Sequence, residues 1–216
     1  SPKGVRALGE AFQARHSGLD VLPNNAGLVL HERQVTKDGF EATLGINHLA
    51  PFLLTHLLLD VLKASGPARV VNVSSEAHRY AQLDLSDLQS ERSFNMMRVY
   101  GNSKLANILF TQALARRLQG TQVTTNSLHP GVVRTGFGLN TQGWMRFVVQ
   151  AFGLFFLTAE KGARTSVYLS SSPEVAGVTG QYFIKCRQRV PSRAARDEQL
   201  AERLWQVSAE LTGVKA

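Results

Sequence analysis

Residues 68–75 read Ala-Arg-Val-Val-Asn-Val-Ser-Ser, and this stretch decides the fold class. The run up to Val73 is nearly continuously apolar, which is typical of a strand buried on both faces of a parallel sheet. Longer segments with helical spacing lie on both sides of it, and further short strand-like runs lie beyond them. Strands that alternate with helices predict an α/β protein with a doubly wound parallel sheet.

The predicted elements alternate along the whole chain. We expect strands over residues 19–22, 68–73, 122–128 and 181–184, and helices over residues 5–14, 38–63, 99–118, 159–170 and 197–211. The basic stretch from Lys185 to Arg196 contains Pro191, and we expect it to be an exposed loop. Because no internal repeat and no linker interrupts the pattern, residues 1–216 are predicted to form a single domain.

The composition is typical of a globular protein, with 44% hydrophobic and 19% charged residues. The formal net charge is +8. The basic residues are spread along the chain without interleaved aromatic motifs, so we expect a solvated basic surface and no nucleic-acid partner. Cys186 is the single cysteine, which excludes an internal disulfide and favours a reducing compartment. The spacing of His and Cys fits no metal site, and none is expected.

Polar and glycine-containing segments follow three of the predicted strands. Residues 24–27 follow the first strand, Ser74 and Ser75 follow the second, and residues 129–131 follow the third. In open parallel sheets, ligands bind outside the carboxyl ends of the strands. We therefore expect one site at this edge of the sheet.

Tyr100 and Lys104 carry the strongest chemical signal. They are four residues apart on a predicted helix, so their side chains share one face. A free tyrosine titrates at about 10. A cation about 4 Å away would stabilise the phenolate by roughly 4 kcal/mol at an effective dielectric of about 20. The pair therefore predicts a tyrosine with a lowered pKa that exchanges protons near neutral pH, although the spacing alone is common.

Ser75 and Asn47 supply the context for that pair. A hydroxyl at the end of a buried strand could hydrogen-bond a substrate oxygen beside Tyr100, and a turn or helix cap is the alternative. No G-x-S-x-G surrounds Ser75, which argues against a hydrolase nucleophile. Asn47 lies shortly before Pro51, which lacks a backbone donor. We expect a local kink there whose freed carbonyl could hold a water, and an Asn on a surface turn is the alternative.

In their order and spacing, these motifs resemble the short-chain dehydrogenase/reductase family. The resemblance is carried by residues 24–27, Asn47, residues 71–75, the pair Tyr100 and Lys104, and residues 130–135. Residues 100–111, 129–135 and 201–205 look like the retinol dehydrogenase branch of that family. The resemblance implies a Rossmann-like fold. It also implies an NAD(P)-dependent oxidoreductase that interconverts a lipophilic alcohol, such as retinol, and its aldehyde or ketone.

The resemblance also implies roles for individual residues. Tyr100 would be the general acid/base, and Lys104 would lower its pKa and hold the nicotinamide ribose. Ser75 would polarise the substrate carbonyl, and Asn47 would hold a relay water. The residues implied to bind the cofactor are Asn25, Ala26, Gly27, Tyr100, Lys104, Pro130, Gly131, Val132 and Thr135. The implied cofactor is NADP, with NAD as an alternative.

The family's glycine-rich turn for the cofactor pyrophosphate has no counterpart before Asn24, and the Gly-x-Gly of residues 136–138 lies too late to serve. We therefore expect an N-terminally truncated domain, the C-terminal portion of the fold with its first strands absent. The strand over 19–22 would then be a sheet edge, which suits Pro23 because proline lacks a ladder donor. We expect such a chain by itself to bind nicotinamide cofactor weakly or not at all.

Two other functions stay open beside the enzyme. One is a catalytically inactive truncated isoform that acts as a binding or decoy subunit. The other is a sugar-nucleotide epimerase, which shares the Tyr-x-x-x-Lys spacing. Residues 24–27 and the short C-terminal region argue against an epimerase.

The segment from Trp144 to Leu157 is too short to span a bilayer and contains four phenylalanines, Phe147, Phe152, Phe155 and Phe156. A lid over a lipophilic substrate with peripheral membrane contact, a buried core helix and a dimer contact all stay open for it. The helices over 38–63 and 99–118 are candidates for homodimer contacts. We expect an intracellular protein, in the cytoplasm or at the endoplasmic reticulum or mitochondrial membrane.

Overall fold

The computed structural model describes residues 2–131 and 158–215. Within these ranges a five-stranded sheet has the order β1-β2-β3-β4-β5. The strands are β1 (Val21–Asn24), β2 (Arg69–Val73), β3 (Thr124–His129), β4 (Tyr182–Ile184) and β5 (Arg187–Arg189). The first four are parallel, and β5 is antiparallel to β4.

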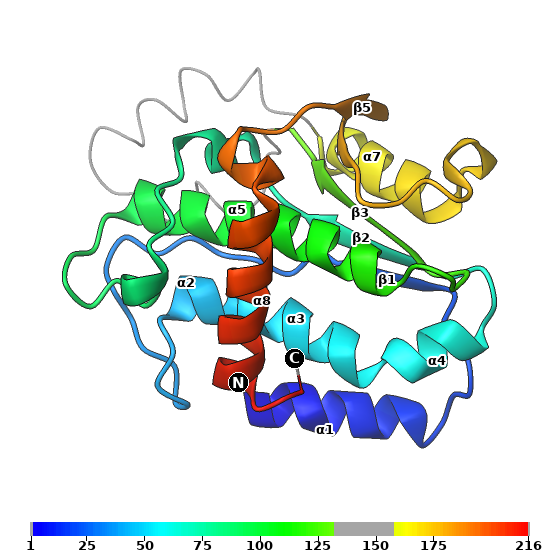
Figure 1. The fold of residues 1–216 in the computed structure, drawn as a ribbon, viewed down its shortest axis with the longest axis horizontal. Helices are drawn as coiled ribbons and strands as arrows, with labels where there is room; N and C mark the ends of the chain where they lie inside the picture. Colours follow the sequence, from blue (N-terminus) through cyan, green and yellow to red (C-terminus); the bar gives the residue numbers. More distant parts are fainter. Residues whose placement is uncertain (1, 132–157, 216) are drawn as a thin grey trace.

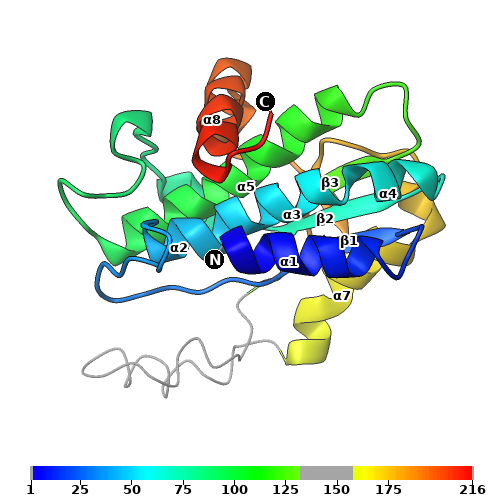
Figure 2. The same ribbon diagram turned by 90° about the horizontal axis from the view of Figure 1, so that it is seen from below.

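Helices cover both faces of this sheet (Figures 1 and 2). On one face lie α3 (Ala50–Leu57), α4 (Leu59–Ala64), α5 (Met96–Arg117) and α8 (Glu198–Thr212), and α1 (Pro2–Gln13) packs along α3. On the opposite face lies α7 (Ala159–Ser171), as Figure 2 shows. The short helical turns are η2 (Glu76–Tyr80), η3 (Leu85–Asp87), η5 (Pro173–Val175) and η6 (Ala194–Arg196). The predicted α/β class with a doubly wound, Rossmann-like sheet is confirmed.

The core is divided into two clusters by the sheet. Val70 belongs to the cluster under α5, whereas Val71 and Val73 belong to the cluster under α7. Successive side chains of a strand point to opposite faces, so a continuously apolar strand contributes to both clusters. The predicted burial of this strand on both faces is confirmed.

β1 is the edge of the described sheet, as predicted, but its predicted boundaries were wrong. The strand runs through Pro23 to Asn24 rather than ending at Leu22. The Asp20 carbonyl accepts a hydrogen bond from the Arg69 N–H at 2.8 Å. In a parallel strand, the backbone groups of every second residue bond to the same neighbouring strand. The backbone N–H and C=O of Leu22 therefore point toward β2, and the nitrogen of Pro23 points to the open edge of the sheet. The missing N–H of Pro23 therefore removes no hydrogen bond between β1 and β2.

The single helix predicted over 38–63 is divided in the structure. It consists of α2 (Ala42–Leu44), a π-helical turn η1 (Gly45–Leu49), and then α3 and α4, which are separated at Leu58. It starts late because the Glu41 carboxylate caps it, accepting from the backbone N–H groups of its first turn at 2.9 and 2.7 Å. The irregularity expected near Asn47 is present as the π turn, a feature common at functional sites.

The basic stretch from Lys185 to Arg196 is largely exposed, except for Ala195, which is buried in the core, and it is not a loop throughout. Lys185 and Cys186 both have positive φ, 51° and 59°, and reverse the chain between β4 and β5. A two-residue reversal of this kind joins antiparallel strands. Neither residue is a glycine or an asparagine, the residues that usually indicate such a turn, which is why β5 was missed.

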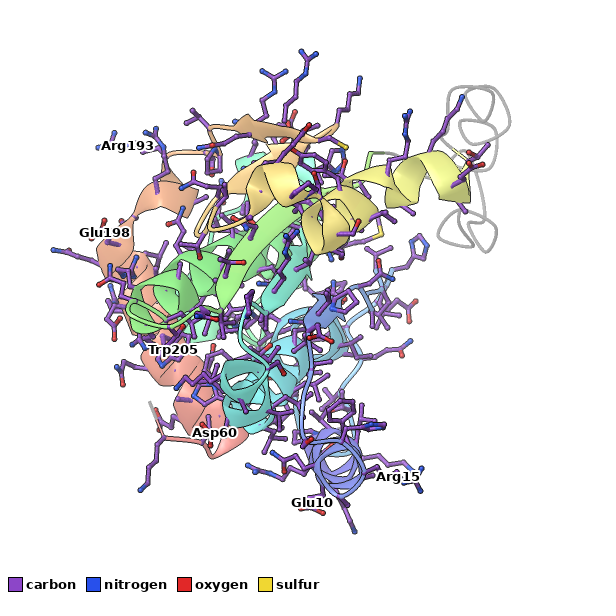
Figure 3. The ribbon with its side chains drawn as sticks, turned by 90° about the vertical axis from the view of Figure 1, so that its right-hand side faces the viewer. Glu10, Arg15, Asp60, Arg193, Glu198 and Trp205 are labelled. Carbon is purple, nitrogen blue, oxygen red and sulfur yellow. The ribbon has the colours of Figure 1, made fainter. Side chains whose placement is uncertain are left out.

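α8 lies across α5 (Figure 1). Trp205 lies between the two helices (Figure 3), with its ring centroid 5.0 Å from that of Phe52 and 5.8 Å from that of Phe110. The Arg117 guanidinium lies 4.0 Å from the centroid of the same ring. The sides of α3 and α5 that turn away from the sheet are thus partly covered by the chain's own α8. The homodimer through 38–63 and 99–118 stays a prediction, and it would have to use the surface that α8 leaves uncovered.

Several predictions concern positions outside the described residues. These are Val132, Thr135, the Gly-x-Gly of 136–138, and the segment 144–157 with its four phenylalanines. Across residues 2–131 and 158–215, no helix is both long and apolar enough to cross a bilayer.

Candidate active site

Three strand ends meet where the sequence predicts the site. Residues 25–27 follow β1, Ser74 and Ser75 follow β2, and Pro130 and Gly131 follow β3. The Ser74 N–H donates to the Leu128 carbonyl at 2.7 Å, which holds the ends of β2 and β3 together. Gly131 has a φ of 89°, a left-handed conformation that favours glycine.

Ser75, Tyr100 and Lys104 come together at this edge. The side chains of Ser75 and Tyr100 are hydrogen-bonded to each other. The Lys104 Nζ lies 5.6 Å from the centroid of the Tyr100 ring. Lys104 is buried, whereas Ser75 and Tyr100 are partly exposed. The predicted proximity of these three side chains is therefore present in the structure.

A close approach between η2 and α5 holds the serine beside the tyrosine. The Ser75 Oγ accepts from the Ala77 N–H at 3.2 Å and so caps η2. A Cβ added at Gly101 would lie 2.8 Å from the Ala77 carbonyl oxygen, which is too close for any side chain. Gly101 thus allows η2 to pack against α5 one residue after Tyr100. The helix-cap alternative for Ser75 is confirmed, and the same residue contacts Tyr100. Its hydrogen bond to a substrate oxygen stays a prediction.

Hydrogen bonds with residues at the end of β2 hold Lys104 in place. Its Nζ donates to the Val73 carbonyl at 3.2 Å, and its own carbonyl accepts from the Ser74 hydroxyl at 2.7 Å. Burial lowers the pKa of Lys104 to about 8. The ammonium form is thus still the major one at neutral pH, but it is easier to deprotonate than a surface lysine.

The expected direction of the Tyr100 pKa was wrong. Burial raises the pKa of Tyr100 above its ordinary value, and the hydrogen bond with Ser75 only partly opposes that rise. The Lys104 ammonium lies beside the ring and is hydrogen-bonded to the Val73 carbonyl rather than to the phenol. The desolvation of the phenolate therefore outweighs the attraction of the cation.

Asn47 is a fully buried connector, so the surface-turn alternative was wrong. Its Oδ1 accepts from the Leu28 N–H at 2.8 Å, and its Nδ2 donates to the Leu28 carbonyl at 2.9 Å and to the Ser103 Oγ at 3.0 Å. The Ser103 hydroxyl in turn donates to the Tyr100 carbonyl at 2.8 Å. Asn47 thus ties the segment after β1 to α5. Its role with a relay water stays a prediction.

Gly27 lies directly against Asn47 and Lys104. A Cβ at Gly27 would lie 3.3 Å from both the Asn47 Oδ1 and the Lys104 Nζ. Asn25, Ala26 and Gly27 are all exposed. Glycine has no side chain to crowd the Lys104 ammonium group, so a sugar hydroxyl, such as one on the ribose of a nicotinamide cofactor, suits this position as a hydrogen-bond partner. The residues present therefore fit the implied cofactor.

His78, which we did not single out from the sequence, supports the segment that carries Ser75. Its Nδ1 donates to the Ser75 carbonyl at 2.7 Å, and its Nε2 accepts from the Ser192 N–H at 3.1 Å. These two backbone partners require the neutral ring, and burial lowers the pKa of His78. No local pattern indicates this contact, because Ser192 is far away along the chain.

Two more buried polar side chains near the site, those of Asn107 and His48, were not predicted from the sequence. Asn107 donates to the same Val73 carbonyl as Lys104, at 3.1 Å, and His48 lies next to Asn107. Asn107 is three residues after Lys104, so helical spacing could have indicated it. In the part of the chain that the structure describes, no group of His, Cys, Asp or Glu is arranged to hold a metal ion.

Comparison with known proteins decides the family. Residues 1–145 match the short chain dehydrogenase family. The chain belongs to this family. The resemblance stated from the motifs of the sequence is thereby confirmed.

The relatives of this short chain dehydrogenase include the retinol dehydrogenases. The chain is 47% identical to human retinol dehydrogenase 14 over 218 residues, which cover 99% of the chain and 65% of that protein. It is 46% identical to human retinol dehydrogenase 12 over 213 residues, covering 99% and 67%. The crystal structure of an uncharacterized protein from Mycobacterium paratuberculosis superimposes with a TM-score of 0.79 at 32% identity, over 100% of this chain and 73% of that one. The chain thus spans about two thirds of the length of these curated relatives.

Proposed function

We propose that the protein to which this chain belongs is an NAD(P)-dependent oxidoreductase that interconverts a lipophilic alcohol and its aldehyde or ketone. The observation that carries the proposal is the convergence of Ser75, Tyr100 and Lys104 beside the exposed Gly27. The retinol dehydrogenases among its relatives support retinol and retinal as the first substrates to test.

The chain's own residues would border both the nicotinamide end and the adenosine side of the cofactor. Lys104 would donate to the ribose, and the exposed backbone of Asn25, Ala26 and Gly27 would border the adenosine side. Pro130 and Gly131, together with Val132 and Thr135 beyond the described residues, would border the nicotinamide. When bound, the cofactor supplies or accepts the hydride, and the protein orients it. NADP is our proposal for the cofactor, with NAD as the alternative.

Ser75 and Tyr100 would then manage the substrate oxygen and its proton. Ser75 would hold the substrate oxygen through a hydrogen bond. In carbonyl reduction that oxygen would take a proton from Tyr100, and in alcohol oxidation the hydroxyl would give its proton to Tyr100. Because burial raises the pKa of Tyr100, the phenol is protonated at neutral pH in the ligand-free protein. That state suits a general acid for carbonyl reduction. For alcohol oxidation, the nearby Lys104 cation favours the phenolate that must form.

The inactive binding or decoy subunit remains the alternative function. It would need neither the hydrogen bond between Ser75 and Tyr100 nor the lysine beside them, so their presence favours the enzyme. An intracellular location, at a membrane or in the cytoplasm, and peripheral membrane contact through 144–157 are also proposals.

The test is turnover by the full-length native protein that contains this chain. Retinal reduction with NADPH and retinol oxidation with NADP are measured for the wild type and for Tyr100→Phe. We expect the variant to lose at least about a hundredfold in kcat, because a general acid/base contributes that much or more. Tyr168→Phe is the matched control, since Tyr168 lies in α7 and bonds Glu174 at 3.0 Å. Equal kcat for Tyr100→Phe and wild type, or no turnover of any lipophilic alcohol or aldehyde with either cofactor, would refute the proposal.

A further inference from the structure

A chain of buried polar side chains runs from α8 to the carbonyl group that holds Lys104. The Ser208 Oγ lies 2.8 Å from the His48 Nε2, and the His48 Nδ1 lies 3.4 Å from the Asn107 Oδ1. The Asn107 Nδ2 donates to the Val73 carbonyl at 3.1 Å, and that oxygen also accepts from the Lys104 Nζ at 3.2 Å. Ser208, His48 and Asn107 are 0%, 1% and 3% exposed, so water does not replace these contacts.

The partners determine the direction of each hydrogen bond. Because the Asn107 amide donates through its nitrogen to Val73, its oxygen faces His48, and an amide oxygen can only accept. The proton of His48 is therefore on Nδ1, and Nε2 accepts from the Ser208 hydroxyl. Burial lowers the pKa of His48 to about 4, so the ring stays neutral across the physiological range. Every donor in the chain points toward Val73.

We propose that Ser208, His48 and Asn107 are positioning residues that orient the Val73 carbonyl and, through it, the Lys104 ammonium beside Tyr100. The role of Lys104 in this statement rests on the proposed function. A lysine side chain has many rotamers, so a fixed acceptor at its end decides where its charge lies. Asn107 also shares the lone pairs of that acceptor, which limits how strongly the carbonyl stabilises the ammonium.

Under this proposal α8 helps to position Lys104 through Ser208, although α8 contributes none of Ser75, Tyr100 and Lys104. Ser208 is 160 residues from His48 in sequence. The same contacts would also exist if they only satisfied buried polar groups. That purely structural role predicts a loss of stability with no effect on Lys104, so the decisive measurement must report on Lys104 itself.

The experiment compares Asn107→Leu with Thr111→Val in the full-length native protein. Asn107→Leu keeps the approximate size of the side chain and removes its donor to Val73 and its acceptor for His48. Thr111 is the matched control because it is 0% exposed and one turn further along α5. Its hydroxyl bonds the Asn107 carbonyl at 2.7 Å and the Asn72 Nδ2 at 2.9 Å, so the control also breaks buried hydrogen bonds.

The readout is the pKa of Lys104, measured without cofactor by NMR titration of its ¹³C-labelled ε-carbon and assigned with Lys104→Arg. In Asn107→Leu the Val73 carbonyl loses its second donor and binds the ammonium more strongly. We expect the pKa of Lys104 to rise by about half a unit or more. It should stay unchanged in Thr111→Val. With retinal, Asn107→Leu should lower kcat about tenfold and leave KM within about twofold of wild type.

Ser208→Ala tests the far end of the chain with little change in volume. Removal of its hydroxyl leaves His48 and Asn107 weaker donors, so the pKa of Lys104 should rise in the same direction by a smaller amount. If Asn107→Leu does not fold, the titration of Ser208→Ala decides the question. The proposal is overturned if the folded variants keep the Lys104 pKa of the wild type. A shifted pKa in a protein that turns over no alcohol or aldehyde would uphold the positioning role and refute the proposed function.

Discussion

α5 and α7 pack on opposite faces of the same sheet, and they bury different kinds of residue (Figure 2). α7 buries only Gly162, Thr165 and Leu169. α5 buries a long apolar stripe and, among it, a polar group that consists of Ser103, Lys104, Asn107 and Thr111. Each of those four is hydrogen-bonded. A buried polar side chain is costly unless it is partnered, and the partners of the polar group on α5 come from β2 and η1. Of these two helices, α5 is therefore the one that buries a connected set of polar groups.

Replacement of one lysine on each helix should give the largest difference between the two faces. Lys104→Met should lower kcat about a thousandfold, because the cation that supports Tyr100 and the cofactor is lost. Its stability should be equal to or above that of the wild type, because a buried charge is removed. Lys161→Met, on the exposed surface of α7, should change neither. Turnover and urea denaturation check the pair, and an active Lys104→Met would contradict the division of roles.

Large-to-small changes should affect the two faces alike in stability. Leu109 lies in the cluster under α5 at 0% exposure, and Leu169 lies in the cluster under α7 at 2%. Each change to alanine should lower the free energy of unfolding by about 2–5 kcal/mol. Leu109→Ala should cost the more, since its cluster is larger and relaxes less easily. Urea unfolding measures both, and a near-zero cost at Leu109 would show that the α5 cluster is not a packed core.

The α5 face should also make stability depend on pH. Burial lowers the pKa of His48 from its ordinary value of 6.5 to about 4. The unfolded chain binds a proton first as the pH falls, so stability is full above pH 6.5 and declines until pH 4. Over that window the loss amounts to about 3 kcal/mol. His48→Gln should flatten this part of the profile of unfolding free energy against pH. An unchanged slope would mean that His48 is not the group responsible. α7 contains no histidine.

A single methyl group at Gly101 should give the smallest of these effects. Because its Cβ would lie 2.8 Å from the Ala77 carbonyl oxygen, Gly101→Ala forces η2 away from α5. We expect a stability loss of about 1–3 kcal/mol and a clear fall in kcat as Ser75 moves from Tyr100. Gly45→Ala is the control, since its Cβ would meet only the side chains of Phe40 at 3.4 Å and Thr36 at 3.6 Å, both ordinary contact distances. Equal kcat in both variants would show that the close contact between η2 and α5 does not matter for the site.

Local patterns were sufficient for the framework of the molecule. They predicted β2 from its apolar run and α5 from its helical spacing. They also predicted that the polar residues after three strands lie at one edge of the sheet. The spacing of Tyr100 and Lys104 put both on one face, and the motifs identified the family. These signals depend on the repeat of a strand or a helix, and that repeat is a property of neighbouring residues.

Only the tertiary structure decided the environment of those residues. It showed that burial raises the Tyr100 pKa instead of lowering it, and that Asn47 is a buried connector. It brought Ser208 to His48, and it reversed the chain at Lys185 without a glycine. Burial and hydrogen-bond partners are contributed by segments far apart in the chain. They therefore cannot be predicted from the composition of any one segment, whereas the periodicity of a segment can be seen in its own residues.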